Sequence, residues 1–253
     1  MFRNEMPRVY ELRDLIDDPL SPCAYFQNFD TSICDDDPSK KQTWLAREEA
    51  FQKLDLESWS FLKSEAFPYL TAQDPNGRGW EQLISILNQA YAYNYLVDQG
   101  CLVVRFIPRA DKAGQETPDL CGVYKGRKVL CEVKTMQVSE NEATCRQAQQ
   151  GRVITNILSG GFLNKLHHDL CKAKKQLASY ASAEDTKRIV FLIINFDDAL
   201  GEYKAGYYAQ IDQYLATASF PDIDIVLYNQ WTPFHAKMSM KHAIVVNAAM
   251  LLP

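Results

Sequence analysis

Residues 117–135 have the sequence TPDLCGVYKGRKVLCEVKT, and this stretch decides the expected fold. Two apolar runs rich in strand-forming residues, 119–124 and 128–135, flank a short polar segment at 125–127 that contains glycine. Strand-like runs joined by a short glycine-containing segment are typical of a β-hairpin. The sequence therefore predicts two antiparallel strands joined by a tight turn.

Three charged residues of this hairpin could meet at one point. Side chains alternate between the two faces of a strand, so Glu132 and Lys134 project from the same face, while Asp119 stands near the start of the partner strand. Asp119 is expected to reach them only if the strands splay or bend there. Two carboxylates, with the Val133 carbonyl, can hold a divalent metal and activate water beside an ammonium group. This combination is suited to phosphodiester cleavage.

The composition is that of an ordinary globular protein. The chain has 253 residues, of which 47% are hydrophobic and 23% charged. No apolar run approaches the roughly 20 residues needed to span a bilayer, and the N-terminus lacks the apolar core of a signal peptide. The seven cysteines are odd in number and scattered. We therefore expect a cytoplasmic protein without a membrane span or a disulfide framework.

The charge is unevenly distributed along the chain. Residues 1–75 hold 8 Lys/Arg against 15 Asp/Glu, residues 76–190 hold 16 against 11, and residues 191–253 hold 3 against 6. The chain has a net charge of −5, but of these three stretches residues 76–190, which include the hairpin, are net positive. A local positive field can attract a polyanion, although chance unevenness and solvated helix faces explain such a distribution equally well.

The pattern of elements predicts an α/β protein. Residues 1–75 form a mainly helical, acidic extension, in which 44–62 have helical periodicity, and residues 76–253 form the main domain. A mixed sheet flanked by helices is expected in this domain. Its helices are predicted at 80–99, 162–181 and 207–217, and its strands at 101–107, 119–124, 128–135, 189–196, 223–228 and 243–246.

Pro118-Asp119 followed by Glu132-Val133-Lys134, in this order of elements, resembles the PD-(D/E)XK nuclease superfamily. The resemblance covers roughly residues 78–196 and implies a restriction-endonuclease-like fold with an αβββαβ core. It implies a DNA endonuclease that uses Mg²⁺, for which Mn²⁺ substitutes. Asp119 and Glu132 would bind the metal and Lys134 would assist the water. Glu81, near the start of the helix before the first strand, matches a further acidic position of the family.

Other residues of the basic stretch are candidates for DNA contacts. Some branches of the family carry Gln-x-x-x-Tyr on the helix after the motif, and Gln176 and Tyr180 match this pattern. Lys172 lies one turn earlier, on the same helix face. Arg146 and Arg152 belong to the polar segment 137–161 and would reach the duplex.

Simpler interpretations stand beside this one. The pattern (D/E)-x-K recurs at 185–187 and 202–204, and Pro-Asp recurs at 221–222. Glu132 and Lys134 as an ordinary surface ion pair would contribute under about 1 kcal/mol. A non-catalytic module that binds nucleic acid or protein on a nuclease-like fold is the main alternative, and a hydrolase for another phosphate ester is a third. Restriction, repair, phage-derived and mobile-element roles stay open, as does a homodimer suited to cutting both strands.

Overall fold

The computed structural model describes residues 2–16, 26, 29–32, 38–70, 79–109, 116–136, 156–181, 185–194, 203–228 and 243–246. The chain divides into two compact units, of which the first runs to Tyr95 and the second begins at Leu96. The predicted boundary at residue 75 lies outside the described residues and stays a prediction. Among the described helices, none is both long and apolar enough to span a membrane.

The first unit is helical, as predicted. It contains α1 (Pro7–Arg13), α2 (Phe29–Ser32), α3 (Pro38–Gln52), α4 (Leu56–Leu70) and most of α5 (Gly79–Asp98). The helical periodicity of 44–62 belongs to two helices, because Asp55 starts α4 by accepting a hydrogen bond from the Ser58 N–H at 2.7 Å. The buried Glu48 of α3 does the same for α1, whose Val9 N–H donates to its carboxylate at 2.9 Å.

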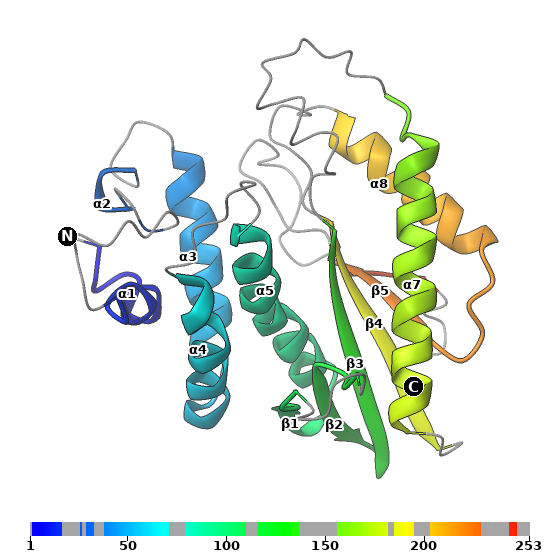
Figure 1. The fold of residues 1–253 in the computed structure, drawn as a ribbon, viewed down its shortest axis with the longest axis horizontal. Helices are drawn as coiled ribbons and strands as arrows, with labels where there is room; N and C mark the ends of the chain where they lie inside the picture. The colour runs from blue at the N-terminus through cyan, green and yellow to red at the C-terminus, as the bar shows by residue number, and fades with distance from the viewer. Residues whose placement is uncertain are drawn as a thin grey trace. The chain divides into compact units, whose positions relative to one another are not determined.

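The second unit is built on an open mixed sheet (Figure 1). The strands β1 to β5 lie side by side in chain order, and β6 follows at the far edge. β1–β2, β2–β3 and β5–β6 pair antiparallel, whereas β3–β4 and β4–β5 pair parallel. The α/β class with a mixed sheet is therefore confirmed. The bounds are β1 (Leu102–Phe106), β2 (Leu120–Tyr124), β3 (Arg127–Met136), β4 (Thr186–Ile194), β5 (Asp224–Tyr228) and β6 (Ala243–Val246).

The predicted hairpin is present, and its turn is one residue shorter than expected. Tyr124 pairs with Arg127, so only Lys125 and Gly126 form the loop. Their φ angles are +48° and +79°, and two-residue hairpin loops favour positive φ at both positions because the resulting twist matches that of the strands. This short turn fixes which residue of β2 faces which residue of β3.

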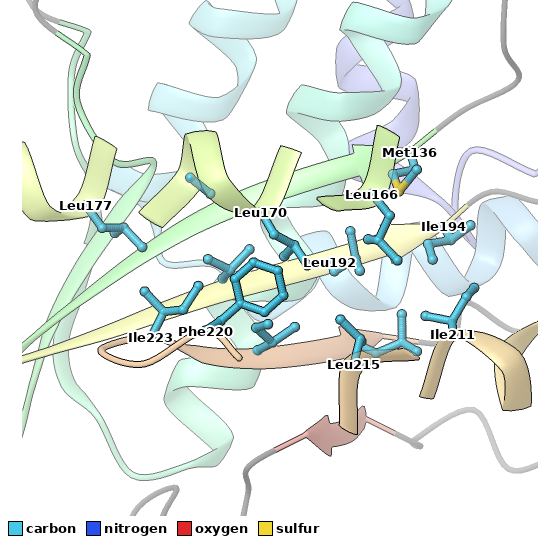
Figure 2. Packing of buried hydrophobic residues seen from close by; sticks show 14 of the residues in the cluster. Met136, Leu166, Leu170, Leu177, Leu192, Ile194, Ile211, Leu215, Phe220 and Ile223 are labelled. Carbon is cyan, nitrogen blue, oxygen red and sulfur yellow. The ribbon is translucent and has the colours of Figure 1, made fainter. Parts of the chain in front are cut away.

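Two helices cover one face of the sheet. α7 (Gly160–Tyr180) packs on β3 and β4, and its buried leucines meet Tyr208, Ile211 and Leu215 of α8 (Tyr203–Thr217) in one apolar cluster (Figure 2). Ser159 caps the start of α7 by accepting the Phe162 N–H at 3.2 Å. The cluster includes Leu130 and Met136 of β3. Because side chains alternate between the two faces of a strand, the even-numbered residues of β3 face α7.

Candidate active site

The α7-side row of β3 begins with Lys128, which is exposed. In the covered part of the row, Leu130 and Met136 are buried in the cluster under α7 and flank Glu132 and Lys134. Glu132 is only 3% exposed. A buried charge costs free energy unless it is paired, so packing alone does not explain a carboxylate here. The predicted common face of Glu132 and Lys134 is confirmed by an ion pair of 2.7 Å between them.

The hairpin register brings Asp119 to the same place. Leu120 pairs with Cys131, and one further step of an antiparallel register sets Asp119 opposite Glu132. The strands therefore need not splay to bring the two carboxylates together. Asp119 directly precedes β2, and its Oδ2 accepts a hydrogen bond from the Val133 N–H of β3 at 2.7 Å. This bond holds the Asp119 side chain against β3.

Both oxygens of Glu132 have partners. Lys134 Nζ donates to Oε1 at 2.7 Å, and Gln176 Nε2 of α7 donates to Oε2 at 2.9 Å. Gln176 Nε2 also donates to the Thr117 carbonyl at 2.7 Å, so one buried amide ties β3 to the segment that leads into Asp119. A carboxylate oxygen carries two lone pairs, and each oxygen of Glu132 can therefore still accept a metal ion.

The two carboxyl groups titrate as a pair. Burial, followed by the negative charge of Asp119, raises the pKa of Glu132 to about 8, against the opposing effect of Lys134. Burial also raises the pKa of Asp119, although the Val133 N–H and the charges of Lys134 and Arg109 act in the other direction. Two acids so close cannot both ionise easily, so the pair retains one proton at neutral pH.

Lys134 is a cation at neutral pH. Burial acts to lower its pKa, but the charge and hydrogen bond of Glu132, with the charges of Asp119 and Asp169, raise it above the ordinary value of 10.5. A permanently protonated amine cannot serve as a general base. Lys134 can instead orient a water molecule or stabilise negative charge that develops nearby.

The donor set suits a hard divalent cation. Asp119 and Glu132 supply carboxylate oxygens, and the Val133 carbonyl points to the same strand edge as the Val133 N–H that Asp119 accepts. Among the described residues no group of three or more His, Cys, Asp or Glu side chains could hold a metal ion. Mg²⁺ keeps several waters and binds through one or two carboxylates, so this small set fits Mg²⁺ better than a cation that requires a full protein shell.

The remaining predicted residues lie in different places. Lys172 Nζ is 3.5 Å from Oε1 of Glu116. Glu116 precedes Thr117, whose carbonyl accepts the hydrogen bond from Gln176. The Tyr180 ring lies 5.2 Å from Lys128 Nζ, and Lys128 precedes Glu132 on β3 by about 13 Å. Tyr180 is therefore separated from the carboxylates, whereas Gln176 contacts one of them directly.

Three predicted residues cannot be related to the carboxylates. Glu81 lies in the first turn of α5 and belongs to the first compact unit, so its part in the site stays a prediction. Arg146 and Arg152 lie outside the described residues, and their contacts with DNA also stay predictions.

Sequence reasoning missed two contributors to the site. The Thr117 carbonyl anchors Gln176, and the charge of Arg109 acts on Asp119. The contact of Thr117 is made by its backbone carbonyl, so the identity of its side chain gives no indication of it. Arg109 precedes Asp119 by ten residues in the same basic stretch. This short distance in the sequence could have suggested that Arg109 lies near the site.

Replacing Gln176 by leucine tests whether the amide positions Glu132. The change leaves the Thr117 carbonyl and one Glu132 oxygen without their donor, which should cost about 1–3 kcal/mol of unfolding free energy. Chemical denaturation measures this loss, and Ser179→Ala, one turn away on α7, is the matched control. A loss no greater than that of the control would show that the two hydrogen bonds contribute nothing.

Comparison with known proteins found no matching family model, no matching curated protein and no matching solved structure.

Proposed function

We propose that residues 76–253 form a Mg²⁺-dependent nuclease domain that hydrolyses phosphodiester bonds in DNA, with a restriction-endonuclease-like core. The observation that carries the proposal is the pair of facing carboxylates, Asp119 and Glu132, of which Glu132 forms an ion pair with Lys134 between the buried residues Leu130 and Met136. The α7 side of β3 would be more stable with apolar residues there. A costly charged cluster is better explained by chemistry than by folding.

The order of elements supports the fold. Among the described elements, α5, β1, β2, β3, α7 and β4 follow one another, with β2 and β3 as the hairpin and α7 in the crossover between the parallel strands β3 and β4. This is the αβββαβ order that the sequence resemblance implies. Glu132 and Lys134 on β3, with Asp119 directly before β2, support the resemblance.

Each side chain has a defined part in the proposed reaction. Asp119, Glu132 and the Val133 carbonyl hold Mg²⁺, for which Mn²⁺ substitutes; when bound, the ion polarises the phosphoryl oxygen and acidifies a water molecule. Lys134 orients that water and stabilises the charge of the transition state. Gln176 keeps Glu132 and the segment before Asp119 at a fixed separation.

A plasmid assay tests the proposal. Supercoiled DNA incubated with the protein and Mg²⁺ should become nicked or linear, and EDTA should prevent this. Asp119→Asn should lose at least a hundredfold in rate, as expected when a metal ligand is replaced. Asp222→Asn is the matched control, because Asp222 also follows a proline and is exposed. Equal rates for wild type and Asp119→Asn on plasmid, linear and single-stranded DNA would favour the non-catalytic binding module.

A further inference from the structure

Part of the α7-side face of the sheet lies outside the cover of α7. The register pairs Cys121 with Leu130 and Val123 with Lys128, so these β2 residues share the face of Glu132. α7 packs on β3 and β4, and it buries Leu130 completely. Val123, in contrast, is 37% exposed. The face over β2 is therefore accessible at Val123, whereas Cys121 is half-buried against the apolar cluster.

The accessible face continues onto β1. Arg105 pairs with Cys121, and its Nε lies 3.4 Å from the Cys121 sulfur. Leu102 pairs with Val123 and is 67% exposed. We name this surface the β1–β2 strip and define it by five residues, Leu102, Arg105, Cys121, Val123 and Lys128.

The β1–β2 strip begins at the candidate active site. Asp119 is the next residue before Cys121 on the same face of the hairpin, so the carboxylates form one end of the strip. Val123 and Lys128 form the other end, four residues away on each strand, which corresponds to about 13 Å. A nucleic-acid backbone with one phosphate at the carboxylates would continue past the site along a surface such as the β1–β2 strip.

The strip carries two positive charges, Arg105 beside Cys121 and Lys128 beside Val123. Arg105 and Lys128 are exposed, and no residue of the strip is acidic. Beyond its far end the hairpin adds Lys125 and Arg127, of which Arg127 forms an ion pair of 2.6 Å with Asp185. The Tyr180 ring flanks the strip beside Lys128 and offers a surface on which a base can stack.

We propose that the β1–β2 strip binds the nucleic-acid strand on one side of the bond that is cut. Arg105 and Lys128 contact its phosphates, and Leu102 and Val123 contact its sugars. Phosphates of a duplex strand follow one another every 3.4 Å along the axis, so about four nucleotides span the strip. The inference rests on the proposed function, because the reacting phosphate is placed at Asp119 and Glu132.

Binding measurements with strip variants test the inference. Fluorescence anisotropy with a labelled oligonucleotide, with Ca²⁺ in place of Mg²⁺, gives the affinity at several salt concentrations. Arg105→Ser and Lys128→Ser should each weaken binding roughly three- to tenfold. Each should also lower the slope of log affinity against log salt by about one. Lys53→Ser, an exposed lysine of the first unit, is the matched control and should change neither quantity.

A series of oligonucleotides measures the length of the contact. For the wild type, affinity should rise as the oligonucleotide is extended to about four nucleotides on one side of the bond that is cut, and should then level off. The variant with both Arg105→Ser and Lys128→Ser should show no such rise. Unchanged affinity and salt slope in both single variants would overturn the inference. So would strip variants that alter the oligomeric state of the protein while DNA affinity stays the same.

A small substrate separates this inference from the proposed function. Bis(4-nitrophenyl) phosphate is too short to occupy the strip, so strip variants should hydrolyse it at the wild-type rate. If the wild type does not hydrolyse this compound or DNA, the proposed function fails, while the loss of binding in the strip variants still supports the strip. If strip variants lose activity on the small substrate as well, the strip acts on the site and the inference is wrong.

Discussion

Replacing Lys134 by methionine is expected to lower Mg²⁺-dependent DNA cleavage by at least a hundredfold while the protein stays folded. Methionine keeps most of the length of the side chain but removes the cation that contacts Glu132 at 2.7 Å. Removing one group that stabilises transition-state charge typically costs a factor of about 100 to 1,000 in rate. The fall should therefore appear in kcat, with little change in KM.

The same change should also show that Glu132 depends on its partner. At pH 9, where Glu132 is ionised, the loss of the ammonium leaves a buried carboxylate without its cation and should cost about 3 kcal/mol of unfolding free energy. At pH 6 the cost should be smaller, since Glu132 then carries a proton. Lys187→Met is the matched control, because Lys187 forms a comparable ion pair with Asp224 at 3.1 Å on a neighbouring strand. A variant that cleaves at the wild-type rate would remove Lys134 from the reaction.

Binding of Mg²⁺ is expected to strengthen about tenfold for each pH unit between pH 6 and pH 7.5. The pKa of Glu132 is raised to about 8 by burial and by the charge of Asp119, so the pair must release a proton before both carboxylates bind a cation. Above pH 8 the dependence should level off. Calorimetry in buffers of different ionisation enthalpy should find about one proton released per ion at pH 7 and almost none at pH 9.5.

Stability without metal should change in the opposite direction. The folded-state pKa of Glu132 lies above its ordinary value of 4.5, so the folded state binds more protons than the unfolded state between pH 4.5 and pH 8. The contribution of Glu132 is therefore complete below pH 4.5 and is lost as the pH rises through 8, by at most about 1.4 kcal/mol per unit. Glu132→Gln should lack this slope in denaturation curves. A wild type and a variant with parallel pH profiles would show that Glu132 titrates normally.

Much of the fold follows from local sequence patterns. The strands around the hairpin, the buried strand β4 and the helices α5, α7 and α8 lie close to their predicted positions, because their periodicity matches their burial. Periodicity did not separate α3 from α4, since residues on both sides of the Asp55 cap are apolar at helical spacing. Only the capping hydrogen bond marks that interruption, and an aspartate by itself is a weak indication of a helix start.

The candidate site was predictable only within one strand. Alternation along β3 correctly placed Glu132 and Lys134 on one face. The position of Asp119 depended on the number of residues in the turn, and a loop of two residues, Lys125 and Gly126, sets it opposite Glu132. The contact of Gln176 with Glu132 required the packing of α7 on β3, which no local pattern specifies. Tyr180, four residues later, lies against Lys128 for the same reason.

If Asp119 and Glu132 together hold one divalent cation, a crystal soaked in Mn²⁺ should reveal it. The anomalous signal of manganese identifies the ion without reference to a particular substrate. We expect one strong peak in contact with an oxygen of Asp119, an oxygen of Glu132 and the carbonyl oxygen of Val133, at about 2.0–2.3 Å from each. The peak should vanish in Asp119→Asn. A wild-type crystal with no peak between these two carboxylates, under conditions that support cleavage, would show that they do not share a metal ion.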